Sequence, residues 1–252
     1  MNSQRKSYQT DANTTESKIY SIIPLVYSHM MRGVSYSSWA EYILALFDIV
    51  NPERSRVLEI ASGTSAVSKY LKDKFELYII SDQSKEMLKV NERKDAFPVC
   101  FDMRSIPLKG KFDFIFSIFD SINYLMTTKD LSTFFNECKN LLSEDGVLTF
   151  DVSLRKNSLK NLKLLNRHGK INGVKYKQTS KYDPDKAIHM NIFEIEYNNR
   201  IYKEVHKQRI YEFETFFVVI YDNGLVVADC FNCFTFDDAN PGAECVQFVV
   251  RK

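Results

Sequence analysis

The chain has 252 residues, of which 44% are hydrophobic, and a formal net charge of +2. This size and composition are typical of one large globular domain, or of a domain with an insertion, that buries a substantial core. The nearly balanced charge calls for no polyanionic partner, and no apolar run reaches the ~18 residues of a membrane-spanning helix.

Residues 1–17 are polar and lack the apolar centre of a signal peptide, so we expect a disordered tail on a cytoplasmic protein. Five cysteines without framework spacing favour reduced thiols. Cys230 and Cys233 form an isolated CxxC pair in an apolar segment. Residues three apart on a strand point to opposite faces, and no second pair completes a tetrahedral site, so we expect no metal.

Residues 19–50 are expected to form cap helices interrupted near Pro24 and Gly33. The cap carries four aromatic side chains that suit a cationic ligand: Tyr20, Tyr27, Tyr36 and Trp39.

A strand, a small-residue turn and a helix are predicted from the run RVLEIASGTSAVSKYL, residues 56–71. Glu59 ends the strand, and Gly63 lies in the turn. A turn of this kind lets a ligand approach the backbone and meet a helix N-terminus, which favours a carboxylate or phosphate. An ordinary connection between a strand and a helix has the same composition, so this run alone leaves both readings open.

Acidic residues also follow the next predicted strands. Asp82 lies 23 residues beyond Glu59, close to the ~20-residue offset of a carboxylate that binds ribose hydroxyls. Asp102 and Asp120 end the third and fourth strands, and Asp113, at the entry of the fourth, is expected to stabilise the fold. Because ligands bind at the carboxyl ends of parallel strands, we expect a nucleotide-like ligand at this edge.

The rest of the chain predicts a core with an insertion. Strands and helices alternate over residues 55–152, which indicates a parallel sheet wound on both faces, with a helix ending near Gly146 before the fifth strand. Residues 153–211 alternate with period two and turn at Asn198-Asn199, as an antiparallel β lid would. Residues 212–252 return to the core and supply a closing antiparallel pair.

These segments resemble the class I S-adenosylmethionine (SAM)-dependent methyltransferases, specifically the bacterial small-molecule type with an N-terminal cap and a β-rich lid. The resemblance covers roughly residues 18–252 and is carried by VYSHMMRGVSYSSWAEYI, LEIASGTS, SDQSKEML, FDMRSIPL, FDFIFSIFDSINYL, LLSEDGVLTFDV and EVHKQRIY. It implies an α/β fold with a doubly wound, mostly parallel seven-stranded Rossmann-like sheet whose last strand is antiparallel. The core would be residues 18–152 and 212–252, and the lid residues 153–211. The chain departs from the family at Ser65 and Ala61, where glycine is usual or frequent, and at Ser28, where aspartate is usual.

The resemblance implies SAM as cofactor and S-adenosylhomocysteine as product. Asp82 would bind the ribose diol and Asp102 the adenine amino group, with Met87 and Met103 against the ring. The Gly63 turn would receive the methionine carboxylate, and Glu59 would lie near the methionine amine. The predicted cofactor residues are Tyr27, Trp39, Glu59, Ala61, Gly63, Asp82, Gln83, Met87, Asp102, Met103 and Phe119.

For catalysis, the lid segment YKEVHKQRIY supplies His206 as the candidate general base and Glu204 as its orienting partner. Tyr124 and Asn123 would lie near the transferred methyl group by resemblance. An exposed lid histidine without a chemical role is the alternative. The expected acceptor is a nitrogen or oxygen of a small molecule.

Between residues 152 and 182 lie nine Lys or Arg residues and no Asp or Glu, which indicates a solvated surface or a site for an anionic group. This stretch lacks the interleaved aromatic residues of a nucleic-acid platform, so we expect no nucleic-acid partner. We also expect no membrane partner, because no long apolar run is present, and a monomer or homodimer. Two alternatives stay open. One is a non-catalytic binding module with this fold; the other is an NAD-dependent oxidoreductase, which the absence of GxGxxG disfavours.

Overall fold

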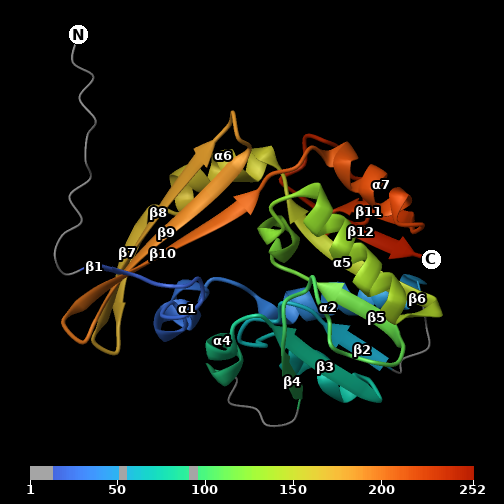
Figure 1. The fold of residues 1–252 in the computed structure, drawn as a ribbon, viewed down its shortest axis with the longest axis horizontal. Helices are drawn as coiled ribbons and strands as arrows, with labels where there is room; N and C mark the ends of the chain where they lie inside the picture. Colours follow the sequence, from blue (N-terminus) through green and yellow to red (C-terminus); the bar gives the residue numbers. More distant parts are fainter. Residues whose placement is uncertain (1–13, 51–55, 91–95) are drawn as a thin grey trace.

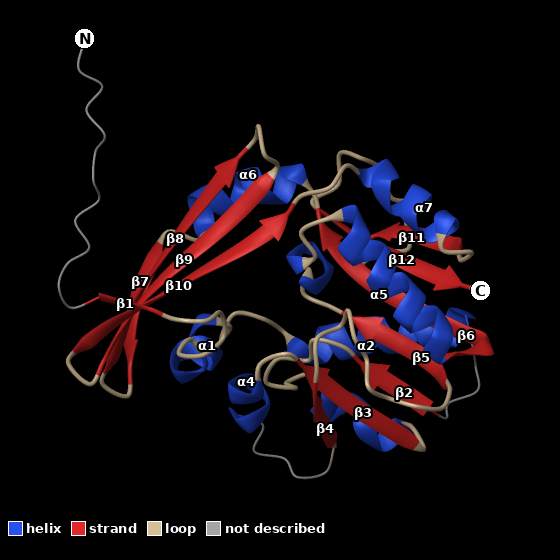
Figure 2. Cartoon of the chain, in the orientation of Figure 1, coloured by secondary structure: helices blue, strands red, loops and turns tan. Residues whose placement is uncertain are grey.

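The computed structural model describes residues 14–50, 56–90 and 96–252, which form two β-sheets and the helices around them (Figures 1 and 2). The strands of the larger sheet are β2 (Arg56–Glu59), β3 (Leu77–Asp82), β4 (Phe97–Cys100), β5 (Phe112–Ser117), β6 (Leu142–Ser153), β11 (Val226–Asn232) and β12 (Cys245–Arg251). In the described ranges they run in the order β11-β12-β6-β5-β2-β3-β4. Neighbours from β6 to β4 are parallel, and β12 is antiparallel to β6. The predicted fold class is confirmed.

Helices cover both faces of this sheet because its strands alternate buried side chains between the two sides. Phe114 and Phe116 of β5 pack in one cluster with α2 (Tyr36–Val50) and α3 (Ser68–Leu71). Ile115 packs on the opposite side with α5 (Thr128–Leu141) and α7 (Phe213–Asp222). Short turns complete this part: η1 (Lys72–Lys74), α4 (Lys85–Val90) and η2 (Ser121–Tyr124).

A second sheet lies beside the larger one in Figure 1, and we call it the lid after the expectation from sequence. It runs in the order β1-β10-β9-β8-β7, with β1 parallel to β10 and the other pairs antiparallel. Its strands are β1 (Thr14–Glu16), β7 (Arg167–Ile171), β8 (Val174–Asp183), β9 (Ile188–Tyr197) and β10 (Arg200–Arg209). The hairpin at Asn198-Asn199 is confirmed, and both residues have positive φ angles of 50° and 58°.

Two expectations for the N-terminus need correction. Residues 14–16, placed in the predicted disordered tail, form β1 against the lid; residues 1–13 lie outside the described residues. The predicted cap is also divided. The side chains of Ile23, Val26 and Met30 in and before α1 (Pro24–Met30) pack against the lid, whereas α2 packs against the core. The cap therefore joins the two sheets instead of covering one.

Smaller points fix the core. Asp113 accepts hydrogen bonds from Arg56 N (3.1 Å) and Ser143 Oγ (2.9 Å), and so joins three neighbouring strands as predicted. Helix α5 ends at Leu141, earlier than expected, because strand pairing starts at once with Leu142. In the described ranges, none of the helices is long and apolar enough to cross a bilayer.

The expectation that all cysteines are reduced is wrong for one pair. Cys233 and Cys245 form a disulfide between the end of β11 and the start of β12. The β11–β12 ladder brings the two residues together, with the Cys233 N–H donating to the Cys245 carbonyl at 3.1 Å.

The basic stretch lies on α6 (Arg155–Leu164) and the first lid strands. Part of it forms ion pairs: Lys160 with Glu244 and Lys175 with Glu196.

Candidate functional site

A cavity of about 760 Å³ lies at the carboxyl ends of β2, β3 and β5. Residues 18–23 lie between the lid strand β1 and α1, and we call them the strap; its residues 18–21 form part of the cavity wall. The volume is in the range of sites for a cofactor or a drug-sized molecule. Ten of the residues predicted from sequence line it: Tyr27, Ala61, Gly63, Asp82, Gln83, Met87, Asp102, Met103, Phe119 and Tyr124.

The turn after β2 has a backbone that favours glycine at three positions. Ala61, Gly63 and Ser65 have φ angles of +57°, +57° and +56°, in the left-handed region. This explains physically why glycine suits positions 61 and 65. At Gly63 a Cβ would come 3.3 Å from Met87 Cε, so a side chain there would also press on the cavity wall.

Asp82 holds this turn in place. Its carboxylate accepts hydrogen bonds from Gly63 N at 2.8 Å and from Ser84 N at 2.7 Å. Burial raises the pKa of Asp82, although hydrogen bonds from the backbone of Ser84, Gly63 and Gln83 oppose that shift. The helix expected after the turn is only the four-residue α3, so its dipole is small and the anion site at a helix N-terminus is a weaker feature than predicted.

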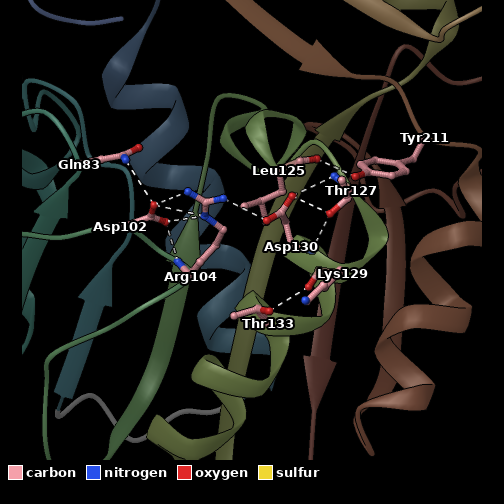
Figure 3. Close-up of polar contacts among 9 residues, drawn as sticks. All are labelled: Gln83, Asp102, Arg104, Leu125, Thr127, Lys129, Asp130, Thr133 and Tyr211. Carbon is pink, nitrogen blue, oxygen red and sulfur yellow. Dashed lines mark hydrogen bonds and ion pairs between the residues drawn. The ribbon is translucent and has the colours of Figure 1, made fainter. Parts of the chain in front are cut away.

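Arg104 joins the two acidic residues at the other end of the cavity (Figure 3). Its Nη2 donates to Asp102 Oδ2 at 2.6 Å and its Nη1 to Asp130 Oδ1 at 3.0 Å. Hydrogen bonding to Arg104 lowers the pKa of Asp102, so this carboxylate is ionised. Asp130 also forms a capping box with Thr127 at the start of α5, so the Arg104–Asp130 ion pair ties the loop after β4 to that helix.

Two predicted cofactor residues lie outside the cavity lining. Glu59 is buried and accepts a hydrogen bond from Tyr78 Oη at 2.7 Å. It shares the face of Val57, which alternation directs toward α2. Trp39 packs behind the wall, with ring centroids 4.7 Å from Phe119 and 4.4 Å from Phe234. The aromatic side chain of the α2 cap that lines the cavity is Tyr36.

Four polar groups form a chain from the cavity into the lid. Tyr20 Oη lies 2.8 Å from Tyr124 Oη, which lies 3.0 Å from His206 Nδ1, and His206 Nε2 lies 2.9 Å from Glu204 Oε2. Tyr20 and Tyr124 line the cavity, whereas His206 and Glu204 are buried behind them. The lid histidine is therefore buried, contrary to the reading of an exposed residue, and it is linked to the cavity through Tyr124.

The charge of Glu204 fixes the donor at each link. Burial would raise the pKa of Glu204, but hydrogen bonds from His206, Ile22 and Ile23 outweigh it and lower the pKa. An ionised carboxylate only accepts, so the N–H at His206 Nε2 donates to Glu204; in the tautomer that carries this proton alone, Nδ1 accepts from the Tyr124 hydroxyl. Tyr124 then accepts in turn from the Tyr20 hydroxyl.

Glu204 also holds the strap. Its two carboxylate oxygens accept four backbone N–H groups, those of Tyr20 (2.7 Å), Ser21 (3.1 Å), Ile22 (2.6 Å) and Ile23 (3.1 Å). The Tyr20 carbonyl accepts from Ser84 Oγ at 2.7 Å, which connects the strap to the loop after β3. The carboxylate of Glu204 thus fixes the position of the strap and the orientation of the His206 ring.

The lid meets the core at the end of β5. Asp120, with a left-handed φ of 50°, accepts from Gln208 Nε2 at 2.8 Å, and burial raises the pKa of Asp120 to about 7. Asn123, expected near the transferred methyl group, is buried outside the cavity lining and donates to the Ser153 and Arg209 carbonyls, so it joins β6 to β10.

Sequence reasoning missed several lining residues. Arg104 and Asp130 line the cavity, as do Ser84 and the strap residues Lys18 and Ile19. Two of these had a local signal: Asp130 closes a T-x-x-D capping pattern, and Ser84 precedes a helix as an N-cap does. The strap had none, because its position depends on a residue far along the chain.

Comparison with known proteins agrees with this geometry. Residues 58–150 match the methyltransferase domain family. YqeM of Bacillus subtilis, provisionally named a methyltransferase, is 36% identical over 141 residues, which are 53% of this chain and 55% of that protein. Residues 58–150 are thus similar to a methyltransferase domain.

Two further similarities bear on the family. The dTDP-3-amino-3,4,6-trideoxy-alpha-D-glucopyranose N,N-dimethyltransferase of Streptomyces venezuelae is 29% identical over 125 residues, 49% of this chain and 53% of that protein. The chain thus spans about half the length of the curated relatives it matches. An SAM-dependent methyltransferase of Clostridium acetobutylicum has the same fold, with a TM-score of 0.76 at 23% identity, covering 92% of this chain and 98% of that one.

Burial makes Glu59 a determinant of the pH dependence of stability. Burial is the main cause that raises the pKa of Glu59, from 4.5 to about 8, and the nearby Asp82 adds to it. A carboxyl with a raised folded-state pKa contributes stability below its unfolded pKa, and this contribution is lost as the pH rises through 8. Glu59→Gln should therefore gain stability relative to wild type between pH 5 and pH 9, by roughly 2–4 kcal/mol.

Urea denaturation at both pH values measures this difference. Glu41→Gln, an exposed change on α2, should track the wild type at each pH. An unchanged difference between wild type and Glu59→Gln across the range would mean that Glu59 is ionised in the folded protein.

Proposed function

We propose that the chain transfers the methyl group of SAM to a nitrogen or oxygen of a small molecule bound in the 760 Å³ cavity. The observation that carries this is the set of carboxylates at the ends of parallel strands, next to the glycine-type turn, in a cavity whose wall includes the strap. The similarity to an amino-sugar N,N-dimethyltransferase makes sugar amines the first substrate class to test.

Asp82 and Asp102 are the proposed polar contacts for the adenosine part of SAM. Asp82 would accept from the ribose diol, because a carboxylate has about four lone-pair sites and keeps acceptor capacity beside its backbone donors. Asp102 would accept the adenine amino group beside Arg104, with Met87 and Met103 against the ring. Bound SAM supplies an electrophilic methyl group on a sulfonium, and aromatic faces such as those of Tyr27 and Phe119 suit that charge.

The hydrogen-bond chain is the proposed path for the proton that the acceptor loses. Burial raises the pKa of Tyr124 well above its ordinary value, so its hydroxyl stays neutral and relays a proton instead of acting as tyrosinate. Its oxygen takes the proton of the acceptor while its own proton passes to His206 Nδ1. The imidazolium formed faces ionised Glu204, an arrangement in which a base is oriented and stabilised by a carboxylate.

A non-catalytic SAM-binding module is the second candidate. It is favoured by Ala61 and Ser65, which hold left-handed angles without glycine, and by Arg104, which already engages Asp102. Turnover separates the two: binding of SAM without methyl transfer to any amine, alcohol or phenol tested would favour the module.

Asp82→Asn should weaken SAM binding by roughly 1–3 kcal/mol, because it removes the charge from an acceptor of hydroxyl hydrogen bonds. Isothermal titration with SAM and S-adenosylhomocysteine measures this. Asp145→Asn makes the same substitution at an exposed position in the first part of β6, and this variant should bind SAM like the wild type. If the wild type binds neither compound at millimolar concentration, the proposed function is refuted. If Asp82→Asn binds SAM with unchanged affinity, Asp82 does not bind the ribose.

His206→Ala should reduce methyl transfer by ~10²-fold or more while SAM affinity stays nearly unchanged, since the histidine lies behind the cavity wall. Tyr124→Phe should show a similar loss, because it interrupts the same path. His168→Ala alters an exposed histidine in the same lid sheet and should keep wild-type turnover. Full turnover by Tyr124→Phe at saturating substrate would show that catalysis depends on positioning without this relay.

A further inference from the structure

Asp151 is a buried carboxylate that the site above does not use. Its side chain belongs to β6 and is 3% exposed. Oδ2 accepts the Asp120 N–H at 3.0 Å, but Oδ1 is buried without a hydrogen-bond partner. A buried carboxyl group with one oxygen unpaired is costly, so this side chain suits a positively charged group bound at either oxygen.

Two sulfur atoms lie beside that carboxylate. Cys233 Sγ, Cys245 Sγ and a carboxylate oxygen of Asp151 all lie within 4.8 Å of one another. The backbone sets this grouping and does not need the sulfur–sulfur bond. Cys245 pairs with Ser153 in the β12–β6 ladder, and the Cys233 N–H donates to the Cys245 carbonyl. Reduction would therefore leave the three side chains together.

From these contacts we propose that the reduced chain binds a thiophilic divalent cation of the zinc type through Cys233, Cys245 and Asp151. Two thiolates and a carboxylate are ligands that zinc accepts in a tetrahedral site, with a fourth position left for water. Both cysteines are only half-buried, so solvent reaches that position. The disulfide form is the closed, metal-free state of the same residues.

The distances suit such an ion. Bonds of ~2.3 Å to sulfur and ~2.0 Å to oxygen place a sulfur and an oxygen ligand about 3.5 Å apart on a tetrahedral centre. Cys245 Sγ and Asp151 Oδ2 are 3.5 Å apart. Two sulfur ligands need about 3.8 Å between them, which the reduced side chains reach by rotation over a Cα–Cα distance of 5.4 Å.

The chemistry balances with a cellular thiol as reductant. Thiol–disulfide exchange gives the Cys233–Cys245 pair two electrons and two protons, and the attacking thiols are oxidised to a disulfide. Both protein thiols then lose their protons to solvent as they bind the cation. The CxxC pair, Cys230 and Cys233, does not supply both sulfur ligands, because Cys230 packs against the core cluster on the face of the sheet that α7 covers.

Cobalt(II) is the probe, because its thiolate complexes absorb in the near ultraviolet where the free ion does not. The full chain, reduced with a phosphine that does not bind metal, should bind one Co²⁺ with this band, and Zn²⁺ should displace it. The oxidised chain should show no band. Cys233→Ser and Cys245→Ser should each lose the two-thiolate band, and Asp151→Asn should weaken binding at least tenfold.

Cys100→Ser is the matched control, since Cys100 is an exposed free cysteine at the end of β4 and should not alter the titration. Circular dichroism of each variant checks folding, and the two serine variants decide the proposal if Asp151→Asn does not fold. A fully reduced wild type without the band, or a Cys245→Ser variant that keeps it, would overturn the metal site. None of these readouts depends on methyl transfer.

Discussion

The buried carboxylate of Glu204 is the constraint on which the arrangement of the cavity depends. A charge at a fully buried position must be met by donors, or folding loses several kcal/mol. Here the donors come from two distant parts of the chain: four backbone N–H groups of the strap and the ring of His206. The hydrogen bonds to Glu204 therefore fix two features at once: the position of the strap at the cavity wall and the donor nitrogen of His206.

This arrangement connects binding to chemistry in the proposed function. The strap supplies Tyr20, whose hydroxyl meets Tyr124, and its carbonyl is held by Ser84 next to Asp82. Movement of the strap would thus alter the cofactor end and the proton path of the cavity at once. The lid is joined to the core at the same region through Gln208 and Asp120, so the two sheets meet where the reaction would occur.

The sequence predicted those parts of the molecule that follow from strand periodicity. Acidic residues at successive strand ends had to meet at one edge, and Asp82 and Asp102 do line one cavity. The turn at Asn198-Asn199 followed from residues that tolerate positive φ. The direction of side chains was harder to predict. Glu59 is the last residue of β2 and lies near the edge where the cavity is, but strand alternation points its side chain to the α2 face of the sheet.

Features that depend on long-range pairing were not predictable. The residues of β1 are polar and pair through backbone alone with the lid edge, so they leave no hydrophobic signal. The Cys233–Cys245 pair requires the register of β11 against β12, which the spacing of cysteines does not contain. The same holds for Trp39, whose partner Phe234 comes from the loop after β11.

Hydrogen–deuterium exchange of the strap tests the central role of Glu204 most directly. Glu204→Gln replaces one accepting oxygen by an amide that faces donors, so the amides of residues 20–23 should exchange at least ~10-fold faster, while those of β5 and β6 keep their protection. Glu194→Gln changes a half-buried lid carboxylate on β9 that pairs with Lys177, and it should leave the strap unchanged. Wild-type protection of residues 20–23 in Glu204→Gln would contradict the account, because the strap would then be held without this carboxylate.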